Sequence, residues 1–106
     1  MAKVTPVKTA LHLSRKSDFT WSVVERTEAG ERITWAADTR LWIEFEGGVT
    51  WDATVDALSG TASWSVDKVE VDKVPAEARY WAYIHKPDDD HGVDMLLRWG
   101  RVVRHG

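Results

Sequence analysis

The amino-acid sequence predicts an all-β fold, and within that class an antiparallel β-sandwich of about eight short strands. Apolar and polar residues alternate with a period of two along most of the chain, which places one class of residue on each face of a strand. Tryptophan, valine and threonine, which are common in strands, dominate these runs. Turn residues such as Gly47-Gly48 and Ser59-Gly60 separate the runs at short intervals. This spacing is typical of immunoglobulin-like sandwiches.

Length and composition limit the remaining possibilities. A chain of 106 residues suits one domain with a small core. We expect residues 1–10 to form an N-terminal arm or first edge strand, because the start is polar and contains Pro6, and residues 11–106 to form a single sandwich domain. The chain has no cysteine, which excludes disulfides, thiolate metal sites and a cysteine nucleophile.

Charge and hydropathy argue against two classes of partner. The formal net charge is -3 and both signs are mixed along the chain, so no basic field for nucleic acid is expected. No run is apolar enough for a signal peptide or a membrane helix, so we expect no membrane partner and folding in a cytosol.

The strands are predicted from alternation and their ends from turn residues. Residues 28–31 predict a hairpin loop and residues 86–92 a longer polar loop. Gly100 interrupts the last run and indicates a bulge or tight turn before Arg101–Arg104. Only Val74–Arg79 contains helix formers, and it is too short for more than one turn. The expected strands are 19–24, 41–46, 49–56, 62–66, 68–72, 80–85, 93–98 and 101–104.

The alternation also predicts which residues form the core. In each run the larger apolar side chains share one face, and that face is expected to point between the two sheets. The expected core residues are Phe19, Trp21, Ile43, Trp51, Val55, Trp64, Ile84 and Leu97.

No group of polar residues forms a convincing catalytic or metal site. The run Asp88–His91 is the most obvious metal candidate, but adjacent carboxylates in an extended loop diverge and no closing glutamate follows. The pairs Glu44 with Glu46 and Asp52 with Asp56 lie along one polar strand face, not across a cleft. None of the four histidines, His12, His85, His91 and His105, has metal-ligand spacing or lies near a serine nucleophile motif. We therefore expect no enzyme activity, no cofactor and no metal.

Tryptophan is the unusual feature of the composition, with seven residues beside two tyrosines and two phenylalanines. Trp42 and Trp81 fall on the strand face opposite Ile43 and Ile84. Such a second apolar surface usually marks a partner site, which favours either another protein or a stacked sugar ring. The alternative is that termini and loops cover this face. Trp35 and Trp99 remain undecided near strand ends. The predicted interaction surface consists of Trp42, Trp81, Tyr83 and Leu96.

Four segments carry a resemblance to a known family. They are Leu11–Trp21, Trp51–Val55, Ala62–Val66 and Gly100–Arg104, and the resemblance covers residues 11–104. Together they resemble the small β-sandwich domain of tailed-phage virion proteins, above all the LtfC-type domain of actinobacterial phages. That domain is similar to the N-terminal domain of BppU-type baseplate proteins of lactococcal phages. Ser17 stands where the family has a glycine before Asp18.

The resemblance implies a non-enzymatic structural or assembly protein of the virion, in the tail, baseplate or head–tail region. It implies docking on other virion proteins and on copies of the same chain, with no catalytic residue. The arm Met1–Lys8 is a candidate to add a strand to a neighbouring sheet edge. The alternative function is a carbohydrate-binding module that recognises a host-surface glycan through exposed tryptophan and tyrosine.

Overall fold

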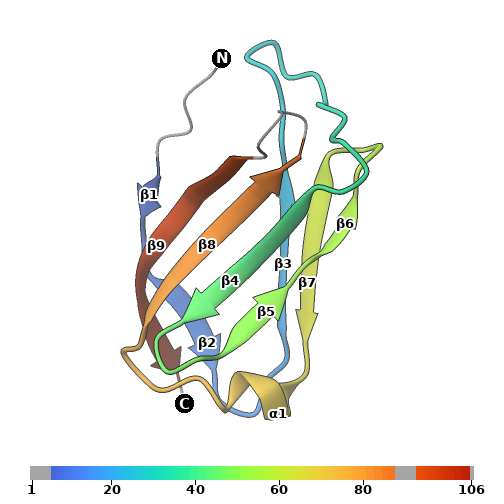
Figure 1. The fold of residues 1–106 in the computed structure, drawn as a ribbon. Coiled ribbons are helices and arrows are strands. Elements are labelled where there is room, and N and C mark those ends of the chain that lie inside the picture. Colours follow the sequence, from blue (N-terminus) through green and yellow to red (C-terminus); the bar gives the residue numbers. More distant parts are fainter. Residues whose placement is uncertain (1–5, 88–92, 106) are drawn as a thin grey trace.

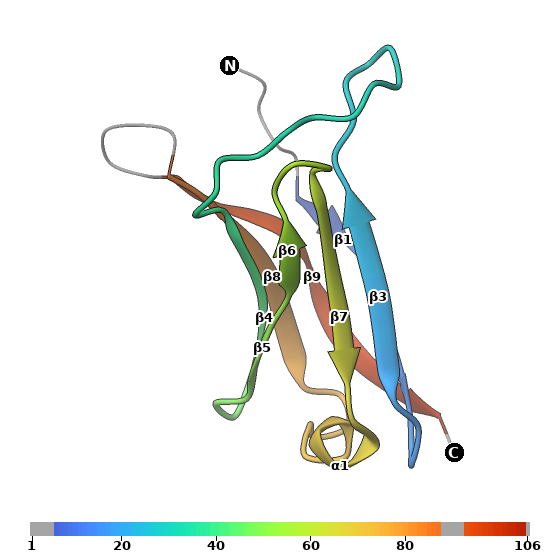
Figure 2. The same cartoon turned by 90° about the vertical axis from the view of Figure 1, so that its right-hand side faces the viewer.

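The computed structural model describes residues 6–87 and 93–105. Two β-sheets pack face to face, which confirms the predicted β-sandwich (Figures 1 and 2). The large sheet has the strand order β1-β9-β8-β4-β5, with β2 also paired to β9, and the small sheet has the order β3-β7-β6. The strands are β1 Val7–Lys8, β2 Leu11–Ser14, β3 Phe19–Val24, β4 Arg40–Phe45, β5 Thr50–Asp52, β6 Thr54–Asp56, β7 Thr61–Val66, β8 Arg79–Lys86 and β9 Val93–His105.

The core lies between the sheets and follows the predicted alternation. Ile43, Trp51, Trp64 and Ile84 are buried as expected. The other four predicted core residues pack against this cluster but remain partly exposed; they are Phe19, Trp21, Val55 and Leu97. Aromatic contacts occur within each sheet and between the two sheets. Trp21 stacks on Trp64 within the small sheet, with ring centroids 4.8 Å apart, and Phe45 contacts Trp51 edge to face within the large sheet. Phe19 of the small sheet contacts Trp51 of the large sheet, with ring centroids 5.3 Å apart.

The predicted single strand 49–56 is two strands in different sheets. β5 pairs with β4 in the large sheet, whereas β6 pairs with β7 in the small sheet. Between them the Ala53 amide donates to the Leu41 carbonyl. Alternation could not reveal this, because a strand that crosses at a sandwich corner keeps its inward residues inward.

The predicted strand 68–72 is wrong, because this segment forms the helix α1, Lys68–Val71. Two carboxylates accept its first amides: Asp67 from Val69 at 2.8 Å, and Asp18 from Lys68 at 2.8 Å. These two capping hydrogen bonds stabilise the helical turn more than the alternation of Val69 and Val71 favours a strand. The following residues 74–79 are not helical. No helix within the described residues is long and apolar enough to cross a membrane.

The expected break at Gly100 is also wrong, because β9 runs unbroken past it and the register shift lies between Ala82 and Tyr83. Gly100 is required for a different reason. A Cβ there would lie 2.1 Å from the Thr9 carbonyl oxygen, so only glycine lets the N-terminal segment approach β9 this closely. The hydroxyl of Tyr80 donates to the same carbonyl at 2.7 Å.

The N-terminal strands depart from a wholly antiparallel arrangement. Both β1 and β2 pair with β9 in parallel, with Val7 opposite Arg98 and Leu11 opposite Val102. All the other strand pairs are antiparallel. The strands β1 and β2 therefore lie beside β9 at one edge of the large sheet (Figure 1).

Candidate interaction surface

The predicted surface residues share the outward face of the large sheet. Trp42 of β4 lies opposite Tyr83 of β8, which lies opposite Leu96 of β9. The next row places Trp81 opposite Trp99. We call the surface formed by Trp42, Trp81, Tyr83, Leu96 and Trp99 the aromatic face. The sequence left Trp99 undecided, and the structure leaves 37% of it exposed; the other four are half-buried.

Cations and a carboxylate hold two of the tryptophan rings. The Arg40 guanidinium lies 5.5 Å from the centroid of the Trp42 ring, and the Lys8 Nζ lies 5.1 Å from that of Trp99. The indole N–H of Trp42 also donates to Glu44 at 3.0 Å. Trp42 stacks on Tyr83 with ring centroids 5.5 Å apart. These contacts order the rings before any partner arrives, which lowers the entropy cost of docking.

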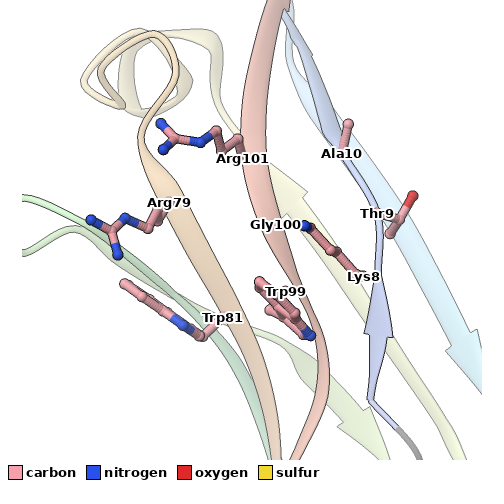
Figure 3. A pocket seen from close by; sticks show the side chains of 8 residues that line it. All are labelled: Lys8, Thr9, Ala10, Arg79, Trp81, Trp99, Gly100 and Arg101. Carbon is pink, nitrogen blue, oxygen red and sulfur yellow. The ribbon is translucent and has the colours of Figure 1, made fainter.

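A shallow hollow of about 680 Å³ opens where the aromatic face meets the N-terminal segment. Trp81 and Trp99 line it, with the cationic side chains of Lys8, Arg79 and Arg101 around them (Figure 3). Arg79 is 3.9 Å from a Glu46 carboxylate oxygen, an exposed pair that solvent screens. The hollow therefore combines an apolar floor with a positively charged rim.

Most of the remaining outward positions of the large sheet are polar; an exception is Val103 of β9, which is 38% exposed. At one end of the aromatic face His85 and Asp94 are 2.5 Å apart, with Arg40 opposite His85 on β4. Within the face, burial raises the pKa of Tyr83, and the nearby Glu44 carboxylate raises it further. A partner would therefore meet tyrosine as a neutral hydroxyl at ordinary pH.

Sequence reasoning missed part of this site. Lys8, Arg79 and Arg101 come from three separate strands, and only the pairing of those strands brings them together. Trp35, also undecided, is buried and donates its indole N–H to Glu25 at 3.0 Å. The metal candidate Asp88–His91 lies outside the described residues.

Two histidines that lie far apart in the sequence, His12 and His105, are in contact at the C-terminal end of β9. The rings of His12 and His105 stack with centroids 5.1 Å apart, and their nearest nitrogens are 2.9 Å apart. They lie away from the aromatic face, next to the end of the chain. No third metal-ligating side chain joins them among the described residues, so they add nothing to the candidate surface.

The sequence comparison supports the resemblance that the segments suggested. The model of the LtfC-like, beta-sandwich domain family matches residues 5–105, nearly the whole chain. No curated protein matches the sequence significantly. The likeness to BppU-type baseplate domains stays a prediction. The family match points to a phage-associated β-sandwich domain. On its sequence and its fold, the chain belongs to the LtfC-like β-sandwich domain family.

Proposed function

We propose that the protein is a structural or assembly component of a phage virion and docks on other virion proteins through the aromatic face. One observation carries the proposal: five apolar side chains share the outward face of the large sheet, where the fold does not need them. Family membership supports the phage context. Exposed clusters of this kind are usual at protein–protein interfaces.

The chemistry of the surface suits a protein partner. Tryptophan and tyrosine rings are frequent anchors, because they bury much apolar area and lose little side-chain entropy. The cations Lys8, Arg79 and Arg101 would meet carboxylates at the rim of the partner and would orient its approach. The proposal gives the chain no catalytic residue and no cofactor, and it places the protein in the virion after folding in the bacterial cytoplasm.

Incorporation into particles tests the proposal. Variants Trp81→Ala and Trp99→Ala would be supplied in place of the native chain in cells producing a phage that encodes it, and the chain in purified particles would be measured by quantitative mass spectrometry. Loss of such an anchor costs about 2 kcal/mol, so we expect incorporation to fall more than tenfold. The control Leu58→Ala removes an apolar side chain that is 84% exposed elsewhere and should change nothing. Absence of the native chain from particles, or equal incorporation of all variants, would contradict the proposal.

One observation favours a second candidate, a module that binds a host-surface glycan. Trp81 is half-buried and lines the hollow, and among the described residues no ring or cation stacks on it, so the part of its indole ring that faces the hollow could stack on a sugar ring. Glycan-array binding that Trp81→Ala abolishes and Leu58→Ala preserves would support this function. A native chain that binds no cell-wall polysaccharide would rule it out.

A further inference from the structure

The strand β3 is an unprotected edge of the small sheet. It pairs with β7 on one side and with no described strand on the other (Figure 2). Its six residues, Phe19–Val24, contain no charge and no proline. The other described edges are shorter, and most are charged: β5 and β6 have three residues each and end in aspartate, and β1 has two residues, one of them Lys8. The edge strand β2 has four residues, Leu11–Ser14, with His12 as its one ionisable side chain. Natural edge strands normally carry such protection, because a bare edge pairs with other chains.

The free edge of β3 has a defined set of unused backbone groups. The Glu25 amide donates to the Gly60 carbonyl, toward β7. Backbone groups of successive strand residues point to opposite sides, so the odd-numbered residues of β3 bond to β7. The amides and carbonyls of Thr20, Ser22 and Val24 therefore point away from the sheet. Their side chains are exposed on the outer face and do not block the edge.

We propose that a second copy of the chain pairs its β3 antiparallel to this edge, around a two-fold axis at Ser22. Ser22 then faces Ser22 of the second copy, and Thr20 faces its Val24. Every unused group of the three residues gains a partner, and the small sheets join into one continuous sheet. The arm cannot fill this role through Val7–Lys8, which already pairs with β9 of its own chain.

Charge sets the register. The Ser22-centred register places Asp18 opposite Arg26 of the second copy, twice by symmetry. A register shifted by two residues in either direction loses both of these opposite-charge pairs, because the residues that would replace one partner, Lys16 and Glu28, lie in turns outside β3. Loss of the pairs disfavours the shifted registers. Asp18 and Arg26 are both exposed. The Asp18 carboxylate accepts from the Lys68 amide through one oxygen, and one nitrogen of the Arg26 guanidinium donates to the Gly30 carbonyl, so the pair with the second copy would use the remaining atoms of each group.

This association is independent of docking through the aromatic face. The pairing uses the edge of the small sheet, whereas the aromatic face lies on the outward side of the large sheet. A dimer would therefore present two aromatic faces. Variants of one surface should leave the other unaffected, so failure of the proposed function and failure of this inference are distinguishable.

Disulfide trapping tests the pairing directly, because the chain has no native cysteine. Directly opposite residues in a hydrogen-bonded antiparallel pair have Cα atoms about 5.5 Å apart, within disulfide range. Under mild oxidation we expect Ser22→Cys to give a covalent dimer. The matched control Ser65→Cys, exposed on the same outer face but on the inner strand β7, should stay monomeric on a non-reducing gel.

The register has its own readout. Thr20→Cys alone should not cross-link, but a mixture of Thr20→Cys with Val24→Cys should give the mixed dimer. Cross-linking of Thr20→Cys with Ser22→Cys instead would overturn the register.

Sedimentation of the full chain tests association without cysteines. We expect a dimer whose dissociation constant rises about tenfold in Arg26→Asp, which faces Asp18, and stays unchanged in Arg26→Lys. Far-UV circular dichroism should show that both variants remain folded. A native chain that stays monomeric at its highest soluble concentration overturns the proposal. Equal cross-linking of Ser22→Cys and Ser65→Cys would also overturn it. The same holds if the β3 edge pairs only with a strand of another protein.

Discussion

The two outer faces of the sandwich differ sharply in composition. The outward face of the large sheet carries three tryptophans, a tyrosine and a leucine, with arginine and lysine around them. The outward face of the small sheet, which we call the hydroxyl face, consists mainly of serine and threonine. Its cross-strand rows are Thr20 with Ser65, Thr54 with Ser63 and Ser22, and Asp56 with Thr61 and Val24.

The contrast separates what folding needs from what function adds. Both sheets turn apolar residues inward, and the sandwich requires no more than that. Small hydroxyl side chains favour strands and stay solvated, so the hydroxyl face is sufficient for a stable sheet. Half-buried and exposed tryptophan rings gain less from folding than rings in the core do. Their presence on one face therefore points to a partner for that face.

Gly100→Ala should disrupt the edge of the aromatic face, and we expect it to lower the free energy of unfolding more than any other variant proposed below. The added methyl group would meet the Thr9 carbonyl oxygen at 2.1 Å and push away the segment that carries Lys8. We expect the free energy of unfolding in urea to fall by about 3 kcal/mol. Ser63→Ala on the hydroxyl face should change it by less than about 0.5 kcal/mol. A similar small change in both variants would show that the close approach is not required.

Tyr80→Phe should destabilise the packing of the same N-terminal segment, around Thr9, by a smaller amount. The substitution removes the hydroxyl that donates to the Thr9 carbonyl at 2.7 Å but keeps the buried ring. We expect a loss of about 1.5 kcal/mol in urea unfolding. Amide hydrogen exchange should accelerate at Thr9, whose amide donates to Trp99, and not in β7. Unchanged exchange at Thr9 would contradict this role.

A double-mutant cycle compares cross-strand coupling on the two faces. Trp42 and Tyr83 stack, so their alanine variants should show a coupling energy of about 1 kcal/mol in thermal or urea unfolding. The equivalent pair on the hydroxyl face, Ser22 and Ser63, should be additive within about 0.3 kcal/mol. Equal coupling energies for the two pairs would contradict the argument that stacking orders the aromatic rings before a partner binds.

Alkaline titration should give the smallest effect. Burial raises the pKa of Tyr80, with Arg98 partly opposing it, and burial also raises the pKa of Tyr83. Tyrosinate absorbance of the folded chain should therefore appear above the ordinary pKa of 10.0. Because the unfolded chain loses these protons first, this contribution to stability is intact below pH 10 and is lost as pH rises beyond it. Titration of both tyrosines at their ordinary pKa would contradict the burial argument; Tyr83→Phe identifies the outward residue.

Much of the candidate surface could be predicted from local alternation. The outward positions of Trp42 and Trp81 follow from their neighbours Ile43 and Ile84, whose burial the period of two requires. The outward position of Trp99 could not be predicted in this way, because β9 contains an extra residue at the register shift opposite Ala82 and Tyr83. Beyond a bulge, odd- and even-numbered residues exchange strand faces. The alternation on one side of the bulge therefore does not predict which residues face outward on the other side.

The sequence by itself determined the strand class and the facing of most residues, because both depend on contacts within a few residues. Only the tertiary structure decided which strands are neighbours. It turned residues 68–71 into a helix through the distant carboxylate of Asp18, and it placed Lys8 beside Trp99 through parallel pairing of β1 with β9. Such pairings join segments far apart in the chain, and their energy depends on packing that no local pattern records.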